Sequence, residues 1–361
     1  MRHIHPFFAT LGVLLAIAAA TPVSLARREA GQRSEERISF TAHVEQYGQL
    51  RKVIGDKLLY IDSLTVIGPV HPTDFHVMYH GALDGRLRVI NLENASFYLD
   101  EVPDNAFYNE REQDDGSTFT RLSNLRRVIL PEGTRRIGEN AFANTDVEHV
   151  NLPESLEEIG TRAFCSANLK GQLVIPSKIT QIPVSAFRSN KEIEEIVFHS
   201  GGLKEIKQGA FSDLYSLRRL ELPEGLRILG GKAFANTKVL EYLYIPSTLD
   251  SVTLRQGGPF DGYSYCPIKQ VRIADGIKCI PENLFYKAPV HWLTLPESVT
   301  EIEHYGFFSQ NIKGITLSPN LMTIGDAGLP YWLKTIIFPA SIQNLGAGLF
   351  WDIRTIYCLS P

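Results

Sequence analysis

The chain has 361 residues, of which 44% are hydrophobic and 21% are charged, as is ordinary for a folded chain. Its formal net charge is -4 at pH 7 and becomes -5 without residues 1–26, which hold one Arg and no acidic residue. This acidic balance argues against a general nucleic-acid binder.

The first 26 residues have the features of a secretory signal peptide. Arg2 supplies a positive start, an apolar run covers 7–20, and Ser24 to Ala26 offers small residues for cleavage. This run is shorter than the roughly 20 residues that span a bilayer. We therefore expect export, with a retained anchor as the alternative. Residues 27–37 are charged and are predicted to be a flexible lead.

Residues 38–86 lack the pattern of the later chain and are predicted to form an N-terminal α/β cap. ISFTAHVEQYGQL, from Ile38, alternates apolar and polar residues, and LLYIDSLTVIG, from Leu58, is a second strand-like run. A strand, a short helix and a strand here would cover the open end of a repeat stack, because solenoids need terminal caps for solubility.

From residue 87 onward one phrase returns with a period of about 23 residues, which predicts a stacked solenoid over 87–361. Its cleanest copy is LRRVILPEGTRRIGENAF, from Leu125: an apolar strand, a proline, and an apolar pair that closes on Phe. Each unit must bury its apolar side chains against its neighbours. A polar segment, 108–118, is predicted to be an inserted loop. We place the closing anchors at Phe107, Phe142, Phe164, Phe187, Phe211, Phe234, Phe260, Phe285, Phe308, Leu329 and Phe350.

Along each repeat strand, buried apolar residues alternate with residues that face outward. Aromatic residues and arginine, which binding hot spots favour, occupy this outer face in three successive repeats. Because parallel strands lie about 4.8 Å apart, they are predicted to form one ligand-binding patch. The alternative is that aromatic residues simply suit strands and the patch is incidental. The predicted ligand-binding residues are Tyr242, Tyr244, Arg272 and Trp292. Polar neighbours expected to tune the choice of partner are Glu195, Arg219 and Glu221.

LPESLEEIGTRAF, from Leu152, and its copies resemble the leucine-rich repeats of the BspA-like class, whose units read as a strand, LP, an apolar-x-x-IG step and AF. The resemblance covers Leu87 to Pro361, and the cap also resembles the N-terminal region of such proteins exported by Bacteroidetes. It implies a strand-rich α/β fold, a right-handed leucine-rich-repeat solenoid. It also implies a secreted or cell-surface location and adhesin-like binding of an extracellular protein or glycan.

The sequence favours no catalytic residue, metal site or cofactor. His71, Asp74, His76 and His80 gather in the cap, but no Glu follows His76 as a zinc-protease motif requires. GYSYC, from Gly262, lacks the final Gly and the strand-then-helix context of a nucleophile elbow.

The four cysteines form no C-x-x-C pair, so we do not expect a zinc site. We expect the cysteines to be small apolar fillers in the stack. An oxidising compartment would permit a disulfide, but the sequence cannot choose a pair. The cysteines are Cys165, Cys266, Cys279 and Cys358.

The sequence thus predicts an exported, non-catalytic binding protein with no membrane-spanning segment in the mature chain. A structural surface protein without a dedicated ligand is the alternative, and a secreted hydrolase is the alternative from a different class. The ligand, the mode of surface attachment and the oligomeric state stay open.

Overall fold

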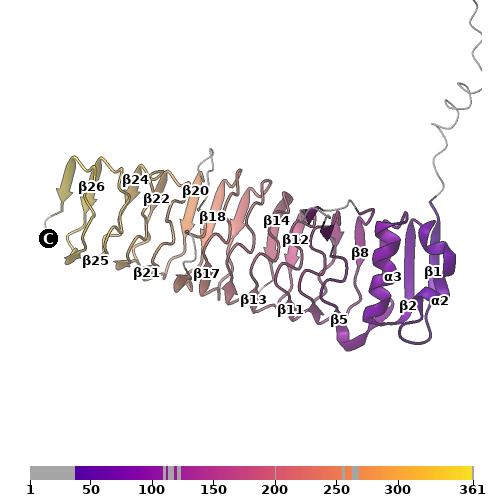
Figure 1. Cartoon of the computed structure of the whole chain (residues 1–361). Coiled ribbons are helices and arrows are strands. Elements are labelled where there is room, and N and C mark those ends of the chain that lie inside the picture. The colour runs from indigo at the N-terminus through magenta and orange to yellow at the C-terminus, as the bar shows by residue number, and fades with distance from the viewer. Residues whose placement is uncertain are drawn as a thin grey trace, which may run out of the picture. The chain divides into compact units, whose positions relative to one another are not determined.

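The structure, a computed structural model, describes residues 37–108, 111–112, 118–119, 123–199, 201–253, 257–261 and 268–359. The chain divides into two units, residues 1–37 and 38–361. The predicted signal peptide and all but the last residue of the flexible lead lie outside the described residues. The second unit is an elongated stack of coils with helices at its N-terminal end (Figure 1). In the described part of the chain, no helix is both long and apolar enough to cross a membrane.

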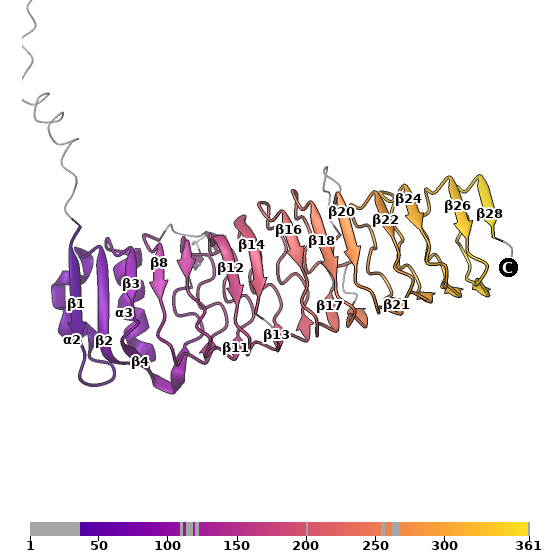
Figure 2. The same cartoon turned by 180° about the vertical axis from the view of Figure 1, so that it is seen from behind.

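The N-terminal end of this unit mixes strands and helices. Its elements are β1 (Ser39–His43), α2 (Leu50–Ile54), the 3-10 helix η1 (Gly55–Leu59), β2 (Ser63–Val70), α3 (Pro72–Leu83), β3 (Val89–Asn91) and β4 (Ala95–Phe97). Strands β1, β2 and β3 pair in parallel, and β3, at the start of the predicted repeat region, pairs with β8 (Arg127–Ile129) of the next coil, so the end segment shares one sheet with the repeats (Figure 2).

Each repeat coil contributes two short strands, which we call its first and second strand. After β3, the first strands are β8 (Arg127–Ile129), β10 (His149–Val150), β12 (Lys170–Ile175), β14 (Glu192–Phe198), β16 (Arg219–Glu221), β18 (Tyr242–Ile245), β20 (Gln270–Ile273), β22 (Trp292–Thr294), β24 (Gly314–Thr316), β26 (Thr335–Phe338) and β28 (Thr355–Cys358). Proline ends most of them because it has no amide hydrogen to donate to a ladder.

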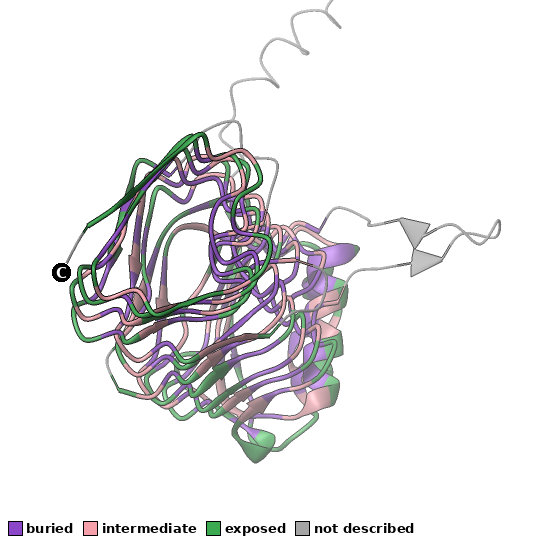
Figure 3. Cartoon of the chain, turned by 90° about the vertical axis from the view of Figure 1, so that its left-hand side faces the viewer, coloured by how far each residue is buried: buried purple, intermediate pink, exposed green. Residues whose placement is uncertain are grey.

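The second strands follow the proline corner and stack among themselves. They are β5 (Glu101–Val102), β9 (Arg136–Ile137), β11 (Glu158–Ile159), β13 (Gln181–Ile182), β15 (Glu205–Ile206), β17 (Ile228–Gly230), β19 (Ser251–Thr253), β21 (Cys279–Ile280), β23 (Glu301–Ile302), β25 (Thr323–Ile324) and β27 (Asn344–Leu345). The 3-10 helix η2 (Tyr98–Asp100) precedes them. Viewed from the C-terminal end, successive coils lie one behind another (Figure 3).

Part of the predicted inserted loop, 108–118, is described. It includes β6 (Arg111–Glu112), which pairs antiparallel with β7 (Thr118–Phe119). Residues 109–110 and 113–117 lie outside the described residues.

A stack of phenylalanine rings fills the centre of the coils, with neighbouring centroids 5.1 to 6.4 Å apart. Every ring in it is at most 2% exposed. Burying one such ring is worth about 1.5–3 kcal/mol, so the stack is a principal source of stability. The stacked rings are Phe107, Phe142, Phe164, Phe187, Phe211, Phe234, Phe260, Phe285 and Phe307.

Two predicted anchors were wrong by one residue. Phe307 rather than Phe308 is fully buried, and Leu349 is 1% exposed where Phe350 is 48% exposed. The anchor directly follows a small residue, Ala in the clean copies and glycine here. At Gly306 an added Cβ would lie 2.9 Å from the side chain of Ile302. The residue that follows this small residue, Phe307 or Leu349, is the one that enters the core.

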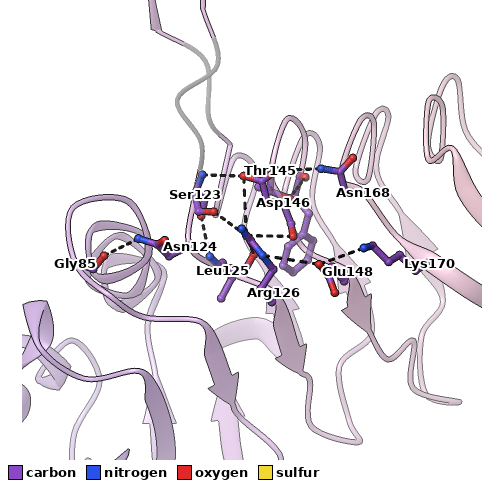
Figure 4. Close-up of polar contacts among 11 residues, drawn as sticks. Gly85, Ser123, Asn124, Leu125, Arg126, Thr145, Asp146, Glu148, Asn168 and Lys170 are labelled. Carbon is purple, nitrogen blue, oxygen red and sulfur yellow. Dashed lines mark hydrogen bonds and ion pairs between the residues drawn. The ribbon is translucent and has the colours of Figure 1, made fainter. Parts of the chain in front are cut away.

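Pairing between the first strands is interrupted at several points. The paired groups are β1-β2-β3-β8-β10, then β12-β14-β16-β18-β20, then β22-β24, then β26-β28. At the first break, between β10 and β12, ion pairs continue across the gap. Glu148 Oε1 lies 3.8 Å from Arg126 Nε and 3.3 Å from Lys170 Nζ (Figure 4). In the same network Asn124 Nδ2 donates to the Gly85 carbonyl, which ties the repeats to the end of α3.

Candidate functional site

The four predicted ligand-binding residues all lie on the outer face of the first strands. On β18 the residues Leu243 and Ile245 are fully buried, whereas the alternating Tyr242 and Tyr244 are half-buried. Arg272 on β20 and Trp292 on β22 are exposed. The strand period of two therefore places these side chains outward.

Three of the four residues form one connected group. Tyr242 is the register partner of Arg219, and Tyr244 is the partner of both Glu221 and Arg272. The Arg219 guanidinium carbon lies 3.9 Å from the centroid of the Tyr242 ring, and that of Arg272 lies 5.8 Å from the Tyr244 ring. Arg219 also forms an ion pair with Glu221. Such cation–π contacts hold the aromatic rings in place at the surface.

Tyr244 is further fixed by a residue that the sequence reading missed. Its hydroxyl donates to Glu224 Oε1 at 2.9 Å, and Glu224 also accepts from the amide and hydroxyl of Ser247. Burial, together with the Glu224 carboxylate, raises the pKa of the Tyr244 phenol. Glu224 directly follows the corner proline Pro223, and that Pro-Glu pair, repeated along the chain, was the available signal.

Trp292 stands apart from this group. Its ring lies over Gly314 on β24, on the side of β22 away from β20. A Cβ added to Gly314 would collide with the indole. Within the described residues β20 and β22 share no ladder and are joined by one bridge, Ile268 to Val290. The predicted single patch is therefore two neighbouring parts, Tyr242–Tyr244–Arg272 and Trp292.

A hollow adjoins the first part. Strands β14 and β16 pair only at Glu195 and Arg219. Just past that pair lies a hollow of about 520 Å³, which we call the Tyr244 hollow. Its lining includes Glu195, Phe198, Arg219, Glu221, Leu222, Pro223, Glu224 and Tyr244. All three predicted polar neighbours thus line a cavity that no strand pattern indicated.

Asp74 and His80 near the N-terminal end have partners within their own segment, and His76 is exposed. Asp74 is 1% exposed and accepts hydrogen bonds from the amides of Gly48, Leu50 and His71. It thereby caps α3. His80 pairs with Asp84 at 3.1 Å. Among the described residues no group of three or more His, Cys, Asp or Glu could hold a metal ion. The GYSYC stretch, residues 262–266, lies outside them.

The cysteines divide by burial. Cys165, Cys279 and Cys358 are free thiols, and Cys266 lies outside the described residues. Cys165 is buried, as a core filler should be, whereas Cys358 is exposed on the terminal strand β28. The filler prediction was therefore wrong for Cys358, because β28 has no following coil in the described chain to cover it.

A stack of coils with parallel strands, in which one apolar pattern recurs, is a leucine-rich-repeat solenoid. The family model described as BspA type leucine rich repeat region matches in six copies, over residues 86–170, 135–255 and 260–359. The chain belongs to this family. No curated protein matches it.

Several solved structures are similar to the chain. A leucine-rich repeat protein from Bacteroides ovatus is 18% identical, with 75% of each chain covered and a TM-score of 0.45. One from Eubacterium ventriosum is 14% identical, with 88% of this chain and 90% of that chain covered and a TM-score of 0.34. A leucine rich cell surface protein from Faecalibacterium prausnitzii is 14% identical, with 87% and 88% covered and a TM-score of 0.29.

Proposed function

We propose that this protein is an exported, non-catalytic, adhesin-like protein that binds an extracellular protein or glycan across the outer face of its first strands. The observation that carries the proposal is the organised group of Tyr242, Tyr244 and Arg272. Its rings are held by Arg219, Arg272 and Glu224 before any partner arrives. Side chains fixed in this way lose little entropy on binding.

The position of Trp292 supports the same proposal. Its side chain is 67% exposed although its ring rests on Gly314, so a large aromatic surface is presented without being needed by the core. Large aromatic residues are the usual anchors of protein interfaces. Together with the Tyr244 group, Trp292 extends the proposed contact over β18, β20, β22 and β24.

Export and location rest on other observations. Residues 1–26 carry the signal-peptide pattern, which supports export, and membership of the BspA-type repeat family fits a secreted or cell-surface protein without a catalytic centre. A structural surface protein without a dedicated ligand is the competing proposal.

The test is binding of residues 27–361 to an array of extracellular matrix proteins and glycans, alongside the double variant Tyr244→Ala/Trp292→Ala. The matched control is Tyr305→Ala/Trp332→Ala, which removes a Tyr and a Trp that are 41% and 51% exposed and lie outside the first strands. We expect the first variant to lose the array signal with its melting temperature nearly unchanged, and the control to retain the signal.

Three other outcomes would count against the proposal. Loss of the signal in both variants would place the contact elsewhere. An array without signal for the wild-type chain would favour the structural protein. Turnover of an array component would indicate the secreted hydrolase.

A further inference from the structure

The Tyr244 hollow contains carboxylates that no cation of the described chain neutralises. Glu195 bonds to the neutral amide of Gln172 at 2.7 Å, and Glu224 bonds to the neutral hydroxyls of Tyr244 and Ser247. In the part of the chain that the structure describes, neither carboxylate belongs to an ion pair within 4 Å, whereas many other surface carboxylates do. Two negative charges therefore lie at this cavity without a compensating charge in contact.

Among the described residues, the one cation that lines the hollow is already engaged. Arg219 forms an ion pair with Glu221, and its guanidinium lies 3.9 Å from the centroid of the Tyr242 ring. Arg272 approaches Tyr244 from β20, on the side of β18 away from β16 and the hollow. The hollow therefore keeps a net negative lining.

The rest of the lining is apolar. Phe198 and Pro223, both half-buried, line the cavity together with the ring of Tyr244, over the buried Leu222. Lysine and arginine side chains place an aliphatic stem on apolar surface and keep the charged head near polar groups. An apolar lining with carboxylates beside it matches both halves of such a side chain.

The protein already contains one example of this contact. Arg219 lies on the ring of Tyr242 and pairs with Glu221, which joins a guanidinium, an aromatic ring and a carboxylate. Tyr244 and Glu224 present the same ring and carboxylate to the hollow, joined by a 2.9 Å hydrogen bond. In this second copy Arg272 approaches the ring from the β20 side, and no cation of the described chain lies within 4 Å of the Glu224 carboxylate.

We infer that the Tyr244 hollow receives a lysine or arginine side chain of an extracellular protein partner. This inference rests on the proposed binding function and assigns its partner to proteins rather than glycans. A neutral sugar would leave the charges of Glu195 and Glu224 uncompensated, while a cationic side chain would form charge-assisted hydrogen bonds with them. Opposite charge at a rim also speeds association and rejects anionic partners.

The test uses nine-residue Gly-Ser peptides with one central Arg, Lys, citrulline or norleucine, immobilised at high density. We expect residues 27–361 to be retained about tenfold more strongly on the Arg and Lys peptides than on the two neutral ones. Glu195→Gln/Glu224→Gln keeps both side-chain shapes and should abolish that preference. Glu132→Gln/Glu301→Gln removes two exposed carboxylates outside the hollow, and should keep it.

Equal retention on charged and neutral peptides would overturn the inference, and so would an equal loss in both variants, which would indicate general electrostatic attraction. The array test separates this inference from the proposed function. If Tyr244→Ala/Trp292→Ala loses the array signal while Glu195→Gln/Glu224→Gln keeps it, the proposed binding face is supported and the cation site is contradicted. If Tyr244→Ala/Trp292→Ala keeps the signal, the proposed function itself is contradicted.

Discussion

The ring of Phe307 lies on the ring of Phe285, with centroids 5.1 Å apart and planes 10° from parallel. Its neighbour Phe308 stacks outside the core, on Tyr286 at 5.7 Å. Phe307→Ala should therefore destabilise the protein by about 3–5 kcal/mol through a cavity in the stack. Phe308→Ala should cost clearly less, since its ring is only half-buried. Urea unfolding of both variants measures the difference. Equal losses of unfolding free energy would contradict the assignment of Phe307 to the ring stack.

Asn190 is a fully buried polar residue between β13 and β14 of its coil. Its side chain accepts from the Leu169 amide at 2.9 Å and donates to the carbonyls of Phe164 and Phe187 at 2.7 and 2.8 Å. Asn190→Ala removes three buried hydrogen bonds and leaves the Leu169 amide and the Phe187 carbonyl without partners, while the Phe164 carbonyl keeps the Ala167 amide, so we expect a loss of about 2–4 kcal/mol in unfolding free energy. Asn320→Ala, at an exposed side chain with one such bond, is the control and should lose far less.

Asp62 should make the N-terminal end sensitive to acid. The hydrogen bond from the Ile38 amide, with the Arg86 guanidinium beside it, lowers the pKa of the Asp62 carboxyl. Because the folded pKa is depressed, this stabilisation is present above the unfolded value near about 3.9 and is lost as the pH falls through the folded one. Wild type and Asp62→Asn should differ in melting temperature at pH 7 and converge towards pH 2. A constant difference across that range would contradict this role.

The free thiols should react at very different rates. Burial raises the pKa of Cys279 to about 12, whereas Cys358 is exposed on β28. The thiolate is the reactive form, and at pH 8 only about 1 in 10⁴ Cys279 groups would carry it. N-ethylmaleimide followed by peptide mass mapping should label Cys358 long before Cys279, and both at similar rates in urea. Early labelling of Cys279 in the native protein would show that its site is open.

The repeat period was readable from the sequence because every coil needs the same few side chains in the same places. Leu243 and Ile245 face inward and Tyr242 and Tyr244 outward, as alternation along a strand requires. The sequence determined the class of fold, the first strands and the side of the sheet on which Trp292 lies.

Other features depended on contacts between coils, which a single repeat does not encode. Phe307 rather than Phe308 is the anchor because its ring, directly after the small residue Gly306, stacks on Phe285 of the preceding coil. Trp292 turned towards Gly314 because only a glycine on the next strand leaves space for an indole. The Tyr244 hollow lies where β14 and β16 separate after one pair, and Glu224, just beyond a proline corner, meets Tyr244 of the next coil beside it. The sequence by itself determined which residues face outward, and only the stacking of one coil on the next decided which of them meet, because neighbours across coils are set by packing distance and not by the repeat pattern.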